Sequence, residues 1–79
     1  MKLTYNPEYN IAYISLKKKS SRVRTVAVSD ELNVDVAPDG SIYGIELLNA
    51  NKQLSADRRN AVVVENKASG ESSKIRLGV

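Results

Sequence analysis

Three acidic side chains, Asp35, Asp39 and Glu46, are the residues whose type and spacing could do chemistry. Two carboxyl groups at a defined separation can serve as general acid and base, and carboxylate oxygens are good ligands for a hard cation. A structural interpretation competes with both, because Asp39 belongs to a Pro-Asp-Gly turn that ends at Gly40. The segment also lacks the alternating acids and the closing Glu of a calcium loop. We therefore predict no metal site and no cofactor.

The residue types that are absent narrow the chemistry further. The chain of 79 residues contains no His and no Cys. Histidine is the commonest general base, and a cysteine thiolate is a nucleophile and a zinc ligand, so Ser-His-Asp and Cys-His arrangements are impossible within this chain. We predict that the protein is not an enzyme and assign no catalytic residue.

A basic segment is the strongest charge feature, although the net charge is only +3. Its five positive side chains are Lys17, Lys18, Lys19, Arg22 and Arg24. They could contact phosphates of a nucleic acid or an acidic partner. They could instead form a solvated strand edge, or be neutralised by the acids between residues 30 and 46.

The elements that must position these side chains are short strands. Strand-like segments occupy residues 2–5, 11–16, 22–28, 32–36 and 41–48, with short polar turns between them. The connections are too short for helical crossovers, so the pattern predicts a mainly β fold, or a β-rich α+β fold, built on an antiparallel meander of about five strands. Residues 1–50 would form the core, and residues 51–79 an extension that packs on the same single domain.

The C-terminal extension has two possible structures. Residues 61–65 contain three consecutive valines and residues 74–77 alternate, which favours a hairpin. The alternative is a helix over residues 55–67, with Ser55 as N-cap.

Gly44 and Glu46 are unusual in the apolar fifth segment. A strand glycine marks a bulge or a close approach by a neighbour, and Tyr13 is a candidate for that space. Glu46 would lie near a sheet rim and pair with a base such as Arg22 or Arg24, or lie at a subunit interface, and we favour charge pairing over catalysis.

Three motifs in order resemble a known small family. They are "YNPEYNIAYISL" at residues 5–16, "NVDVAPDG" at 33–40 and "GIELLNA" at 44–50. Together they are similar to the bacterial and archaeal family of domain of unknown function 2283. The resemblance implies a small β-rich domain, no established activity, and an antitoxin-like role with a protein partner encoded nearby. Asn10 stands where relatives usually carry Asp, which implies a structural role for that position.

Self-association is the last expectation from the sequence. The second and fifth segments carry apolar residues on both faces, more than one small chain can cover. We expect a homodimer or higher homo-oligomer, formed by sheet packing or edge pairing. No apolar run approaches the length of a membrane span and nothing indicates secretion, so we expect a cytoplasmic protein.

Overall fold

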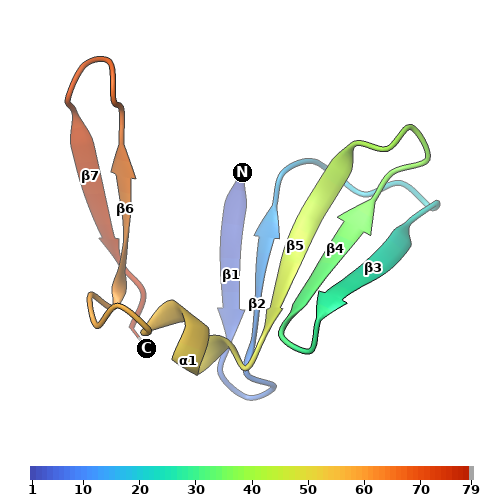
Figure 1. Cartoon of the computed structure of the whole chain (residues 1–79), viewed down its shortest axis with the longest axis horizontal. Helices are drawn as coiled ribbons and strands as arrows, with labels where there is room; N and C mark the ends of the chain where they lie inside the picture. Colours follow the sequence, from blue (N-terminus) through green and yellow to red (C-terminus); the bar gives the residue numbers. More distant parts are fainter. Residues whose placement is uncertain (79) are drawn as a thin grey trace.

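The computed structural model describes residues 1–78, and a five-stranded antiparallel sheet dominates it (Figure 1). Its strands are β1 (Lys2–Asn6), β2 (Ile11–Ser15), β3 (Arg24–Ser29), β4 (Leu32–Val36) and β5 (Ile42–Leu48). The predicted fold class is confirmed, and the strand boundaries differ from the predicted ones by no more than two residues at either end.

The strand order is β1-β2-β5-β4-β3, which departs from chain order at one place. β1 and β2 form one hairpin, and β3, β4 and β5 form a meander. The connection from β2 to β3, residues 16–23, crosses the ends of β5 and β4 to reach the far edge (Figure 1). This order places the apolar β2 and β5 inside the sheet and the fully exposed β3 at an edge.

Register gives the sheet one apolar and one polar face, because directly paired residues point to the same side. An apolar row crosses all five strands; its members are Leu3, Ile14, Ile45, Val34 and Val26. Two polar rows lie on the opposite face: Thr4, Tyr13, Glu46, Asn33 and Ala27 form one, and Lys2, Ser15, Gly44, Asp35 and Thr25 the other. The alternation of β4 therefore continues across these rows, although Ile11 and Leu48 pair on the polar face.

A short helix, α1 (Ala50–Leu54), follows β5 and begins beside Asn10. The backbone N–H of Ala50 donates to the Asn10 carbonyl at 3.0 Å, and that of Asn51 donates to Asn10 Oδ1 at 2.7 Å. Asn10 has a left-handed backbone with φ 56°, which Asn tolerates better than most residues. The alternative helix over residues 55–67 is wrong, because Ser55 caps the end of α1 and not the start of a helix.

The C-terminal hairpin is confirmed as β6 (Ala61–Glu65) paired with β7 (Ser72–Arg76). β7 begins two residues earlier than predicted. The hairpin stands beside β1, separate from the sheet and joined to it through α1 (Figure 1). No helix in residues 1–78 is long and apolar enough to cross a membrane.

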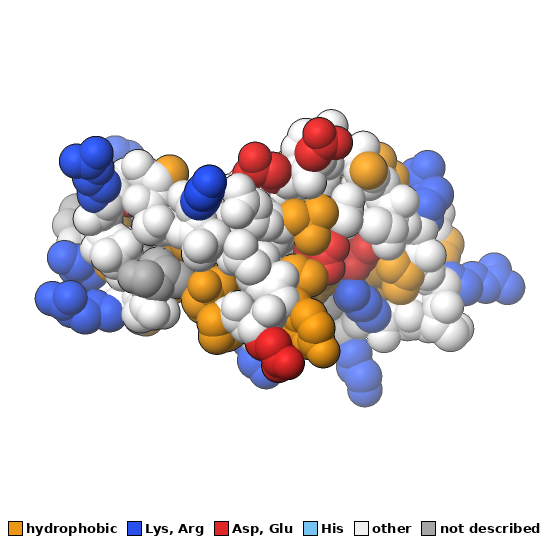
Figure 2. Space-filling view, turned by 90° about the horizontal axis from the view of Figure 1, so that it is seen from below, with side chains coloured by type: hydrophobic (Ala, Val, Ile, Leu, Met, Phe, Trp, Pro, Cys, Tyr) orange, Lys and Arg blue, Asp and Glu red, His pale blue; other side chains and the backbone are white. Residues whose placement is uncertain are grey.

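The molecule buries few apolar side chains. Among residues 1–78 the buried ones are Ala12, Ala37, Tyr43 and Ala50, and no large side chain is fully buried. The radius of gyration is 14.0 Å, whereas a compact chain of this length has about 11.6 Å. From below, Lys and Arg side chains are most numerous at the two ends of the molecule, and a few lie among the hydrophobic and acidic side chains between them (Figure 2).

Candidate functional site

Asp35 is the centre of the most developed polar group, which we call the Asp35 cluster: Asp35, Tyr13, Lys19 and Thr25. Tyr13 Oη donates to Asp35 Oδ2 at 2.8 Å, and Thr25 Oγ1 donates to Oδ1 at 2.7 Å. Lys19 Nζ forms an ion pair with Oδ2 at 2.7 Å and lies 4.3 Å from the centre of the Tyr13 ring. The cluster thus joins β2, β3, β4 and the crossing connection, and Asp35 is only 8% exposed.

The charges of the Asp35 cluster stabilise one another. Burial alone would raise the pKa of Asp35, but hydrogen bonds from Lys19, Thr25 and Tyr13 outweigh burial and hold that pKa below its ordinary value. The hydrogen bond to Asp35 raises the pKa of Lys19. Burial, followed by the hydrogen bond to Asp35, raises the pKa of Tyr13. At neutral pH the cluster is therefore a carboxylate held by an ammonium and two hydroxyl donors.

Gly44 makes room for this cluster. A Cβ atom at residue 44 would lie 2.5 Å from Tyr13 Oη and 2.6 Å from the Ile14 carbonyl oxygen, closer than real contacts allow. The predicted close approach of Tyr13 to Gly44 is confirmed, and it explains why an apolar strand keeps a glycine at this position.

From its charge we expected Glu46 to pair with Arg22 or Arg24, but its partner is a neutral side chain. Asn33 Nδ2 donates to Glu46 Oε1 at 2.9 Å, because β4 lies beside β5 and register places these two residues opposite each other. The sequence pattern could not identify Asn33 as the partner of Glu46. Judged by charge, an ionic partner was favoured over a neutral residue on the adjacent strand.

Asp39 lies apart, at the β4–β5 turn. It accepts hydrogen bonds from Ser41 Oγ at 2.6 Å and from the Ser41 backbone N–H at 3.0 Å, and these bonds lower the pKa of Asp39. Gly40 follows with φ 88°, the left-handed conformation that this turn requires. Within residues 1–78, no three acidic side chains converge where they could hold a metal ion.

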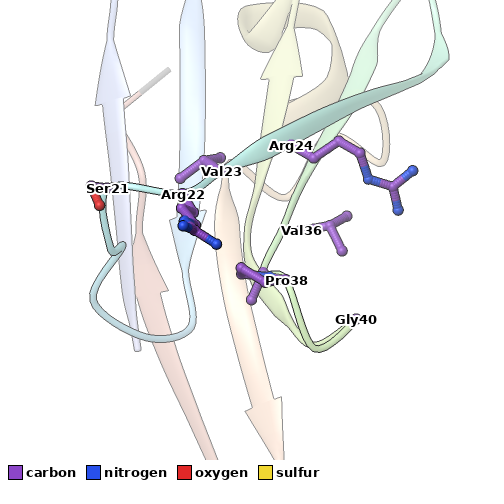
Figure 3. Close-up of a pocket in the computed structure, with 8 residues that line it drawn as sticks. Ser21, Arg22, Val23, Arg24, Val36, Pro38 and Gly40 are labelled. Atoms are coloured by element: carbon purple, nitrogen blue, oxygen red, sulfur yellow. The ribbon is translucent and has the colours of Figure 1, made fainter.

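The basic segment is divided between internal contacts and a cleft. Lys19 belongs to the Asp35 cluster, and Lys17 binds Ser41 Oγ and lies 5.1 Å from the centre of the Tyr43 ring. Arg22 and Arg24 line an open cleft of about 550 Å³ beside the β4–β5 turn. In Figure 3 Arg22 points toward Pro38, whereas the Arg24 guanidinium points away from it. The five positive side chains are therefore not one continuous row.

A second cavity was not anticipated from the sequence. It measures about 550 Å³ and separates the hairpin from the β1 end of the apolar face. We call it the slot; its principal lining residues are Leu3, Tyr5, Ile14, Val62, Val64 and Ile75. Alternation in residues 2–6 and 61–65 could have indicated two apolar surfaces, but not that they face each other.

Comparison with known proteins places the chain in a family whose activity is not described. The family model described as Protein of unknown function (DUF2283) matches residues 2–51, which include the five-stranded sheet and the start of α1. No curated protein and no solved structure matches the chain. Since the matched residues make up more than half of its length, the chain belongs to the DUF2283 family.

Proposed function

We propose that this protein is a non-enzymatic interaction domain that works as a homodimer, with the apolar face of one copy packed on the same face of a second. The observation that carries the proposal is the apolar row, whose five members are only partly buried. Leu3 and Ile14 of this row face the C-terminal hairpin only across the slot, and Val26 at the far edge is 37% exposed. A partly exposed aliphatic face of this extent is typical of an interface.

The accessible surface supports the same proposal. It is 6016 Å², whereas a compact monomer of 8.7 kDa exposes about 4,700 Å². The excess of about 1,300 Å² is larger than the roughly 800 Å² that each partner buries in a standard interface. A second copy is the partner that this excess favours, because one self-complementary face suffices for a two-fold dimer.

The polar side of the sheet supports a structural role over a catalytic one. The carboxylates of Asp35 and Glu46 are engaged by neighbouring side chains, and the chain has no His or Cys to supply a nearby base or thiolate. A strong internal network of this kind fixes strand register and leaves the opposite face to bind a partner.

Two neighbouring residues of β3 provide a matched test. Val26 lies in the apolar row and Ala27 in a polar row, and both are exposed, so a lysine at either position is compatible with folding. We expect light scattering to give twice 8.7 kDa for the wild type and for Ala27→Lys, and 8.7 kDa for Val26→Lys. A wild-type mass of 8.7 kDa at a protein concentration of about 100 µM would overturn the proposal.

Nucleic-acid binding through residues 17–24 is the second candidate, supported by the two arginines that line the cleft. Its weakness is that Lys17 and Lys19 have partners within the chain. Binding to mixed DNA and RNA that weakens steeply as salt rises, and that Arg22→Ala with Arg24→Ala abolishes, would favour it. Absence of binding at low salt would eliminate it.

A further inference from the structure

The C-terminal hairpin, β6 and β7, holds an apolar surface opposite the sheet, and a cavity separates the two. Val62 and Val64 of β6 and Ile75 of β7 line the slot on one side, and Leu3 and Ile14 of the apolar row line it on the other. Ile75 is 60% exposed although it faces other apolar side chains. A cavity with apolar walls on both sides can accommodate another apolar element between them.

The element best suited to that space is β3. It is an edge strand in which all six residues are exposed, including Val26 at 37% and Val28 at 60%. An edge strand also presents unpaired backbone groups along its outer side. Within one chain β3 cannot reach the slot, because it lies at the edge of the sheet opposite β1 (Figure 1).

A two-fold axis can bring the slot of one copy and β3 of a second copy together. If apolar faces pack about a two-fold axis parallel to the strands, β1 of one copy lies opposite β3 of the other. A two-fold axis across the strands would instead place β1 opposite β1 and β3 opposite β3, so that neither slot would receive β3. We propose that the slot of each copy receives β3 of the other copy, an inference that rests on the homodimer proposed above.

Charges at the two ends of these elements match in this arrangement. The β3–β4 turn and the start of β6 lie toward the same end of the molecule (Figure 1). Asp30 and Glu31 follow β3, whereas Arg58 and Arg59 precede β6. The arrangement therefore sets two acids of each copy opposite two arginines of the other, one of which, Arg59, also pairs with Asp57 of its own chain at 3.4 Å.

The other ends add little electrostatic selection. Arg22 and Arg24 lie at the start of β3, but Glu65 at the tip of the C-terminal hairpin pairs with Lys67 at 3.0 Å, and Lys74 of β7 balances Glu71. Charge therefore supports β3 as the occupant of the slot at one end, through the acids of the β3–β4 turn and the arginines before β6.

Engineered disulfides test this arrangement, since the chain has no cysteine of its own. Val64→Cys is mixed under oxidising conditions with tagged Val26→Cys, or with tagged Ala27→Cys as the matched control. We expect at least about tenfold more mixed disulfide with Val26→Cys, because apposed thiols have a high effective concentration whereas residue 27 lies on the opposite face. Circular dichroism checks folding, and Ile75→Cys replaces Val64→Cys if that variant does not fold.

The outcomes separate the two proposals. A dimeric protein that gives no more mixed disulfide with Val26→Cys than with Ala27→Cys overturns the occupancy of the slot and leaves the homodimer intact. A monomeric wild type overturns both. Preferential mixed disulfide in a protein of dimeric mass supports both.

Discussion

At the scale of single residues, Tyr13 and Gly44 form the most specific contact in the sheet. The tyrosine reaches across the glycine of the neighbouring strand to hydrogen-bond with Asp35, one strand further on. The polar face therefore depends on the absence of a side chain at residue 44. A catalytic interpretation of this strand is unnecessary, since packing accounts for its unusual glycine.

Replacing Gly44 by Ala tests this contact. The added Cβ would overlap Tyr13 and the Ile14 carbonyl oxygen, and the carbonyl cannot move without the strand. We expect Gly44→Ala to lower the free energy of unfolding by about 1–3 kcal/mol, measured by urea denaturation. In a Tyr13→Val background the loss should be smaller, because one of the two overlaps is gone. An equal loss in both backgrounds would contradict the contact.

Asp35 gives a prediction on pH. Its pKa in the folded protein lies below the ordinary value of 3.8, so its contribution to stability is present above that value and is lost as pH falls through the folded pKa. We expect Asp35→Asn to cost about 1–2 kcal/mol at pH 7, since Lys19 is half exposed and its pairing is screened. The difference should shrink toward pH 3. If the denaturation midpoints of the wild type and Asp35→Asn differ by the same amount at every pH in this range, the stabilising role of the ionised Asp35 is contradicted.

At the scale of elements, Asn10 links the β1–β2 hairpin to α1. Its side chain accepts from the Asn51 N–H, while its own backbone stays left-handed. An Asp, which the family resemblance implies for this position, can make the same acceptor contact. The residue therefore acts as a cap supplied from a distant part of the chain.

Three substitutions at residue 10 separate its two roles. Asn10→Gly keeps the left-handed backbone and loses the cap, so we expect a cost of about 1 kcal/mol. Asn10→Ala also strains the backbone and should cost about 2 kcal/mol. Asn10→Asp keeps the acceptor for the Asn51 N–H but loses the hydrogen bond that Asn10 Nδ2 donates to Asn51 Oδ1 at 2.8 Å, so it should cost about 0.5 kcal/mol, less than Asn10→Gly. Thermal denaturation ranks them, and equal losses for Gly and Asp would exclude the capping role.

The elements also show what the sequence could and could not predict. Alternation and turn residues located all five sheet strands and the hairpin, because these signals are local. The position of β5 between β2 and β4 was not predictable in this way, since local patterns do not specify which strands pair. α1 was missed because it has no side-chain N-cap of its own and depends on Asn10. The Asp35 cluster likewise depends on strand order.

At the scale of the whole molecule, the charge pattern predicts how dimerisation responds to mutation. We expect Asp30→Lys with Glu31→Lys to weaken dimerisation about tenfold, because both would face Arg58 and Arg59 of the second copy. Adding Arg58→Glu and Arg59→Glu to the same chain should restore it. Sedimentation at two salt concentrations measures both, and a quadruple variant no tighter than the double variant would contradict the pairing.

The connection that crosses β5 and β4 has a consequence for folding rates. The β1–β2 hairpin and the β3–β4–β5 meander contain only local pairings, but the pairing of Ser15 with Gly44 closes a long loop. We expect the two parts to form early and the β2–β5 junction to close after the transition state. Gly44→Ala should then mainly accelerate unfolding in stopped-flow experiments, whereas Val34→Ala in the meander should slow refolding. The opposite pattern would mean that the junction nucleates the sheet.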